Sequence, residues 1–169
     1  PPARLLHVLG QVSRRAALRE FTRASHAPMD AQRERLFANV RDNAETEFGK
    51  RHGFGAIRSI ADYRRDVPLM MQEDLEPWSQ RLMRGERNLL TREPPLAYTT
   101  TTGSTGPSKH IPITASYKRE FQKTVHVAVS HLYERFPEAF RGRVLYFVGS
   151  RRYHSAPDGL DVGAMSGFN

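Results

Sequence analysis

A glycine- and hydroxyl-rich loop is the part of the sequence whose residue types suggest chemistry most directly. It follows Tyr98. Its candidate phosphate-binding residues are Thr101, Thr102, Gly103, Ser104, Thr105, Gly106 and Lys109. Glycines permit a tight turn that points successive backbone N–H groups at an anion, while hydroxyls add donors and the lysine adds a positive charge. The combination predicts a site for nucleotide phosphates; a polar turn between strands is the structural alternative.

Two familiar nucleotide-binding motifs do not match this loop. A Walker A loop has Gly directly before its Lys and Ser or Thr directly after it. Here Ser108 precedes Lys109 and His110 follows it, so no hydroxyl is placed for Mg²⁺. Gly103 and Gly106 also have the wrong spacing for a dinucleotide fingerprint. A nucleotide hydrolase is therefore disfavoured.

The remaining chemical candidates have simpler structural interpretations. His126 and His131 are five residues apart and do not share a helix face, so no metal site is predicted. Glu73, Asp74 and Glu76 fall in the first turn of a predicted helix, where acidic groups favour the helix dipole.

Four aromatic side chains are the last candidates. For His110 we favour a surface or supporting position over a phosphate contact, and we expect Trp78 in the core. Tyr153 and His154 lie in a segment without regular pattern, and facing a substrate is the less favoured interpretation.

The first half of the chain, residues 1–87, is predicted to be mainly helical. Apolar residues at helical spacing predict helices over 3–24, 29–49, 60–65 and 71–84. Ser59 with Asp62 resembles a capping box, and Val67-Pro68 ends the helix that follows. Gly49 or Gly53 is expected to end the second helix, and Gly85 the fourth.

Residues 88–169 carry the loop between short strands at 96–101 and 110–113. Thr114 is a good N-cap for a long helix over 115–135, which Pro137 ends. An apolar run predicts a buried strand at 143–149, and the tail after Ser150 is expected to be loop-like. The fold class is therefore α/β.

Composition narrows the class of protein. The 169 residues contain no Cys, which excludes disulfide scaffolds and thiolate sites, and no apolar run is long enough to span a membrane. The net charge is +8. In the first predicted helix, the residues around the apolar stripe include Arg14, Arg15, Arg19 and Arg23. A basic module for nucleic acid or an anionic membrane is thus the alternative function. The arginines are otherwise dispersed, so neither nucleic acid nor a membrane is expected as a partner. A cytoplasmic location is a separate expectation.

The loop resembles a known signature. Thr101 to Lys109 match, position by position, the phosphate loop of the adenylate-forming enzymes. The flanking segments 66–68, 73–78, 85–86, 94–96 and 111–114 are similar in order and spacing to the GH3 acyl acid–amido synthetases, the auxin-responsive family. The resemblance covers residues 29–149, with a weaker likeness in the glycine-containing loop 158–163, and suggests a bacterial-type relative.

The resemblance implies an activity and its substrates. Such enzymes use ATP, with Mg²⁺, to convert a carboxylic acid to an acyl-adenylate, which an amino acid amine then attacks. It also implies that residues 1–169 are the N-terminal part of a larger adenylating domain, without the C-terminal domain. This portion alone is then expected to be inactive, with no assignable catalytic residue. Because a buried-type strand at 143–149 has few strands to flank it, self-association through apolar surface is also expected.

Overall fold

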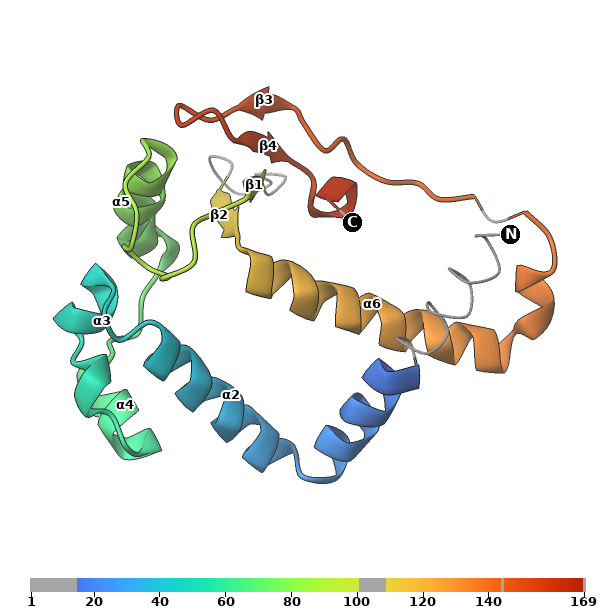
Figure 1. Ribbon diagram of the computed structural model, residues 1–169, viewed down its shortest axis with the longest axis horizontal. Helices are drawn as coiled ribbons and strands as arrows, with labels where there is room; N and C mark the ends of the chain where they lie inside the picture. Colours follow the sequence, from blue (N-terminus) through green and yellow to red (C-terminus); the bar gives the residue numbers. More distant parts are fainter. Residues whose placement is uncertain (1–14, 101–108, 144, 169) are drawn as a thin grey trace. The chain divides into compact units, whose positions relative to one another are not determined.

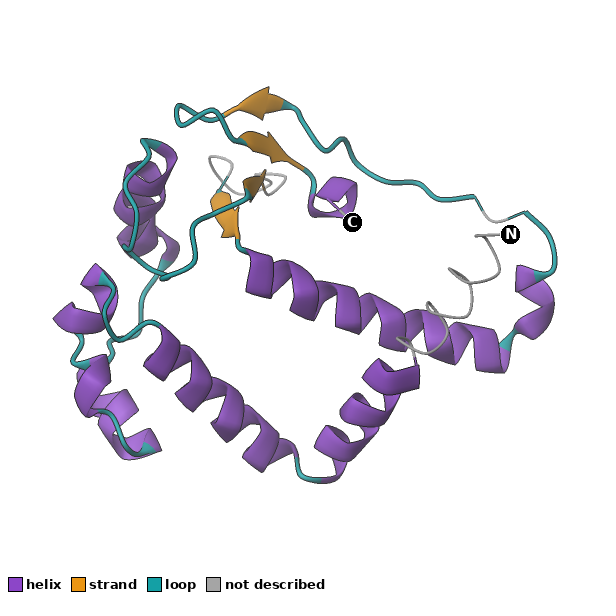
Figure 2. Ribbon diagram, in the orientation of Figure 1, coloured by secondary structure: helices purple, strands orange, loops and turns teal. Residues whose placement is uncertain are grey.

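The computed structural model describes residues 15–100, 109–143 and 145–168 (Figure 1). The chain divides into two compact units, Pro1–Ala31 with Tyr117–Phe147, and Gln32–Ser116 with Val148–Asn169. Figure 2 shows helices, short strands and loops. The elements are helical residues 15–26, α2 (Pro28–Asp42), α3 (Glu47–Arg51), η1 (Phe54–Ala56), α4 (Ile60–Asp66), α5 (Gln72–Met83), β1 (Ala97–Thr100), β2 (His110–Ile113), α6 (Ala115–Arg135), η2 (Pro137–Phe140), β3 (His154–Ser155), β4 (Asp161–Gly163) and η3 (Met165–Phe168). The α/β class is confirmed.

The first unit is built mainly from α6 and the helical residues 15–26. The predicted bounds of α6 are confirmed, and the chain leaves the helix before Pro137. Lys123 joins the two helices by an ion pair with Glu20 at 3.2 Å. Large apolar side chains of α6 and of the residue that follows it are exposed: Tyr117, Val125, Leu132 and Phe136. None of the helices among residues 15–100, 109–143 and 145–168 has the length and apolar character that crossing a membrane requires.

The helix predicted over 29–49 is wrong, because the chain forms two helices with a turn between them. Buried Thr46 is the N-cap of α3: its hydroxyl accepts the Gly49 N–H at 2.9 Å and donates to the Asn43 carbonyl at 2.7 Å. A capping hydroxyl that binds the backbone on both sides competes with continuous helix. Gly53, at φ +62°, follows the end of α3 as expected, whereas Gly49 lies inside that helix.

Local capping signals located the next two helices correctly. Ser59 and Asp62 form the expected capping box of α4, which ends at Val67. In α5 the Asp74 carboxylate accepts the Met71 N–H at 2.8 Å, and Gly85 follows the helix at φ +96°. Glu73 and Asp74 thus lie in the first turn of α5 as expected, whereas Glu76 lies beyond it and accepts a hydrogen bond from Gln80 Nε2 at 2.6 Å.

A four-stranded mixed sheet of order β2-β1-β4-β3 is the centre of the second unit. β1 and β2 are antiparallel, with Ala97 opposite Ile113 and Thr100 opposite His110. β4 runs parallel to β1 and forms an antiparallel hairpin with β3. The expectation of a loop-like tail is wrong, because residues 154–163 supply half of the strands.

Side chains alternate between two packed faces of this sheet. Tyr98 and Val162 lie in one apolar cluster with Trp78 and Leu82 of α5. Ala97 and Ile113 lie in a second cluster with Phe168 of η3. Trp78 is in the core, as expected, and Arg51 stacks over its ring at 4.7 Å. β1, the strand that leads into the predicted loop, is thus covered on both faces.

The strand predicted at 143–149 is wrong. Described residues of this segment have no regular structure, and Leu145, Tyr146, Phe147 and Val148 are 62–91% exposed. An apolar run becomes a strand only where a neighbouring strand takes up its backbone groups. In the described sheet, β1 is already paired on both sides, with β2 and β4.

Candidate functional site

The two strands around the predicted phosphate loop bring its ends together. Thr100 at the end of β1 is paired with His110 at the start of β2. Lys109, directly before β2, is exposed. The other candidate residues, Thr101, Thr102, Gly103, Ser104, Thr105 and Gly106, lie outside the described residues. The pairing of β1 with β2 thus places residues 100 and 109 close together, as a turn between them requires.

Tyr98 holds β1 to the rest of the second unit through a buried hydrogen bond. Its side chain is 0% exposed, and its hydroxyl donates to Asp158 Oδ2 at 2.9 Å. Burial, followed by this hydrogen bond, raises the pKa of the Tyr98 phenol. The phenol therefore stays protonated and remains a donor near neutral pH.

Asp158 joins three parts of the unit. Its side chain is 3% exposed and accepts from Arg87 Nη2 at 3.5 Å as well as from Tyr98. Its other oxygen accepts the Leu160 N–H at 3.1 Å, and its own N–H donates to the Met83 carbonyl at 2.9 Å. Burial of a carboxylate costs free energy unless the group is paired and hydrogen-bonded. The donors from Tyr98, Arg87 and Leu160 offset this cost for Asp158.

Two histidines lie together on the sheet beside Lys109. The rings of His110 and His154 are 6.1 Å apart and nearly perpendicular. His110 Nδ1 is buried, and none of the described residues gives it a hydrogen-bond partner. His110 is half-buried, and His154 is exposed at the edge strand β3. The preference for a supporting position of His110 over a phosphate contact stays a prediction.

The other predicted candidates belong to other parts of the described chain. No group of three or more potential metal ligands occurs among the residues that the structure describes. Tyr153 is exposed just before β3. Arg15, Arg19 and Arg23 are exposed along the helical residues 15–26, and Arg14 lies outside the described part.

Sequence reasoning assigned no role to Arg87 or to the Asp158 carboxylate, although both support the loop-bearing strand. The signal that could have located Asp158 is Pro157-Asp158-Gly159, a turn pattern between two short strands. Gly159 has the expected positive φ, +85°. The partners of a turn carboxylate are non-local, so the sequence offers no comparable signal for the bond to Tyr98.

Comparison with known proteins places this architecture in a family. The model of the GH3 family N-terminal domain matches residues 17–168. The chain belongs to the GH3 family. A probable indole-3-acetic acid-amido synthetase GH3.12 of Oryza sativa subsp. japonica is 28% identical over 142 residues, 83% of this chain and 23% of the relative. A jasmonoyl–L-amino acid synthetase GH3.3 of the same rice is 26% identical over 151 residues, 88% of this chain and 32% of the relative.

Solved structures of GH3 proteins share the fold. A GH3.15 acyl acid amido synthetase has a TM-score of 0.68 at 24% identity, over 79% of this chain and 24% of that protein. The AtGH3.15 enzyme in complex with 2,4-DB has a TM-score of 0.66 at 26% identity, over 75% of this chain and 22% of that protein. The chain thus spans about a quarter to a third of the length of these GH3 relatives. The bacterial-type assignment stays a prediction.

Proposed function

We propose that this chain is the N-terminal part of an ATP-dependent ligase that joins a small carboxylic acid to an amino acid. The observation that supports this most strongly is the GH3 N-terminal domain match over residues 17–168. One relative named above is an indole-3-acetic acid-amido synthetase and another is a jasmonoyl–L-amino acid synthetase. Adenylate formation and a cytoplasmic location belong to the proposal as well.

The proposed reaction has two balanced steps. The carboxylate attacks the α-phosphorus of ATP, which forms the acyl-adenylate and releases pyrophosphate. The amine of an amino acid then attacks the acyl carbon, forming the amide bond with loss of a proton and release of AMP. Negative charge grows on the leaving pyrophosphate in the first step, so donors already in place there lower the barrier.

Within this reaction we assign the phosphates to the loop between β1 and β2. Backbone N–H groups and hydroxyls of residues 101–106 would bind them, and the Lys109 ammonium would contact a phosphate oxygen. The exposed position of Lys109 beside the paired residues Thr100 and His110 fits this role. Mg²⁺ would enter with the nucleotide and balance the phosphate charge.

The test is carboxylic acid-dependent exchange of pyrophosphate into ATP by the full-length protein that carries this chain. A panel of aromatic and fatty carboxylic acids should include at least one that supports exchange, and added amino acids should convert the adenylate to an amide detected by mass spectrometry. The 169-residue chain alone should show no exchange above a blank, because adenylation also requires groups for adenine, ribose and acid. Absence of exchange with every acid, in folded full-length protein, would refute the proposal.

The alternative, a basic module for nucleic acid or an anionic membrane, predicts a different result. Binding through Arg15, Arg19 and Arg23 would fall steeply with salt, since each neutralised phosphate releases a counterion. A filter-binding titration at two salt concentrations separates the two functions.

A further inference from the structure

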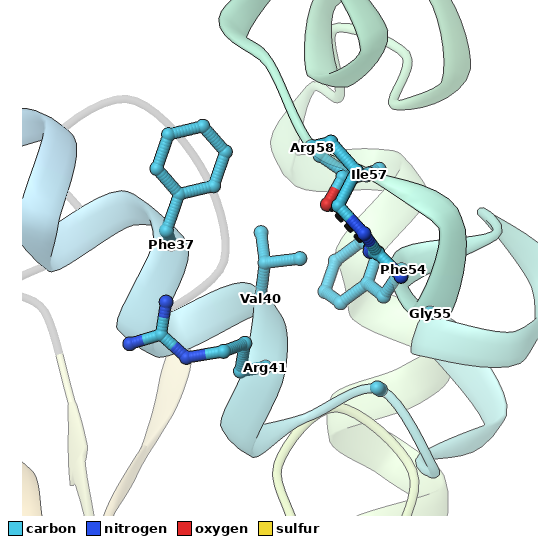
Figure 3. Close-up of a pocket in the computed structure, with 8 residues that line it drawn as sticks. Phe37, Val40, Arg41, Phe54, Gly55, Ile57 and Arg58 are labelled. Atoms are coloured by element: carbon cyan, nitrogen blue, oxygen red, sulfur yellow. Dashed lines mark hydrogen bonds between the residues drawn. The ribbon is translucent and has the colours of Figure 1, made fainter.

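The second unit contains a pocket that the proposed reaction does not use. It has a volume of about 490 Å³ and lies between the C-terminal half of α2 and residues 54–58 (Figure 3). The described residues that line it belong to α2, to the turn after α2 and to residues 54–58, and none of these belongs to the sheet. They differ from the residues that we assign to the nucleotide.

The inner walls of the pocket are apolar and aromatic. Val40 and Ile57 are 2% and 3% exposed, and Figure 3 shows Val40 directed from α2 toward Ile57 and Phe54. Phe37 and Phe54 are half-buried at the two sides. Concave sites of this size with mostly apolar and aromatic walls are typical of small-molecule binding.

The wall formed by residues 54–58 is held in place by the core. Gly53, at φ +62°, turns the chain into η1, and the Ile57 N–H donates to the Phe54 carbonyl at 3.3 Å. The Phe54 ring packs edge-on against Phe48 at 5.8 Å, and Phe48 packs against Trp78 at 5.7 Å. The pocket is thus formed before any ligand arrives.

Arg41 and Arg58 are the charged residues among the described residues that line the pocket. Arg41 is exposed, and no ion pair or hydrogen bond joins its side chain to any residue in the described ranges. Arg58 donates from Nη1 to the Ile57 carbonyl at 2.9 Å, which places its side chain against the wall. The nearby Asp62 carboxylate is occupied by the N–H groups of Arg58 and Ser59 and by Arg65. No carboxylate is among the described residues that line the pocket.

We propose that this pocket binds a small aromatic carboxylate, with its ring against Phe37, Val40, Phe54 and Ile57 and its carboxylate on Arg41. A planar guanidinium pairs with a carboxylate through two parallel hydrogen bonds, which gives direction as well as attraction. Polyphosphates are disfavoured because apolar walls cannot satisfy their many oxygens. Neutral aromatic molecules would bind through the walls alone.

The experiment is calorimetric titration of the full-length protein with 1-naphthoate in the absence of ATP. We expect saturable binding, at least fivefold weaker binding in Arg41→Gln, and a similar loss when 1-naphthamide replaces the acid. Arg64→Gln, at an exposed arginine of α4 that does not line the pocket, is the matched control and should bind as the wild type does. The acid site of the proposed ligase would also take up an aromatic acid, so only the binding that Arg41→Gln weakens and Arg64→Gln leaves unchanged is assigned to this pocket.

A second variant tests the contribution of the apolar walls to binding and leaves the charge of the pocket unchanged. Ala44 also lines the pocket, and Ala44→Leu should fill part of it and weaken binding of the acid and the amide alike. Circular dichroism checks that both variants are folded. The proposal is overturned if wild-type protein shows no saturable binding, or if Arg41→Gln and Arg64→Gln bind equally well.

Discussion

At the scale of single residues, the bond between Tyr98 and Asp158 anchors the strand that leads into the predicted phosphate loop. Tyr98→Phe removes one hydroxyl and leaves the ring, so a buried carboxylate loses a donor at 2.9 Å. We expect unfolding free energy to fall by about 1–3 kcal/mol. Urea unfolding measures the change, with exposed Tyr153→Phe as the control that should stay within about 0.5 kcal/mol. Equal stability of the two variants would contradict the role given to this bond.

The raised pKa of Tyr98 has a consequence for stability at high pH. A phenol in the unfolded chain ionises near pH 10, whereas in the folded protein burial and the Asp158 carboxylate keep Tyr98 protonated to higher pH. The contribution of the protonated Tyr98 phenol to the free energy of unfolding is therefore fully present below about pH 10, and it is lost as pH rises further. Thermal unfolding between pH 8 and 11 should show a steeper loss for wild type than for Tyr98→Phe. Parallel pH profiles would show that Tyr98 does not titrate as described.

Sequence reasoning at this scale succeeded where the partners of a residue are local. Ser59, Asp74 and Pro137 act on backbone groups within a turn of themselves, so their types and spacing were sufficient. Arg81 instead joins α5 to α3 by two bonds to Glu47, at 2.7 and 3.0 Å. Partners 34 residues apart are brought together only by the fold, so no spacing rule predicts them.

At the scale of elements, the turn between α2 and α3 depends on a glycine as well as on the Thr46 cap. A Cβ at Gly49 would overlap the backbone carbonyl of Asn43 and lie against that of Ala44. We expect Gly49→Ala to destabilise the protein by about 1–3 kcal/mol despite the better helix propensity of Ala. Gly55→Ala is the matched control, because nothing lies within 4 Å of its added Cβ. Thermal unfolding should separate the two, and a stable Gly49→Ala protein would refute the close approach.

The elements that sequence analysis missed are those that depend on non-local pairing. The strand predicted at 143–149 had the right composition, but composition does not supply a neighbouring strand. β3 and β4 are two and three residues long, too short for a pattern, and form because β1 offers β4 an open edge. The pairing of β1 with β2 was predictable because one loop connects them.

At the scale of the whole molecule, residues 145–148 present a continuous apolar surface. Isolated exposed apolar residues are ordinary, but contiguous ones favour association. We expect the 169-residue chain to form dimers or larger species in sedimentation velocity at high concentration, and to bind an apolar dye. Phe147→Ser should reduce both effects, while Leu69→Ser, at a fully exposed site elsewhere, should not. A monomer that binds no dye would contradict this expectation.

The central claim, that the loop ending at Lys109 binds the phosphates of ATP during activation of an acid, is tested most directly by Lys109→Ala in the full-length protein. Lys109 is exposed, so unfolding free energy should change by about 0.5 kcal/mol or less. Acid-dependent exchange of pyrophosphate into ATP should fall about 10- to 150-fold, the equivalent of about 1.5–3 kcal/mol, with a larger change in the KM for ATP than for the acid. Lys50→Ala, at another exposed lysine, is the control. Normal exchange kinetics in folded Lys109→Ala would contradict the account and leave residues 101–109 as an ordinary threonine-rich turn.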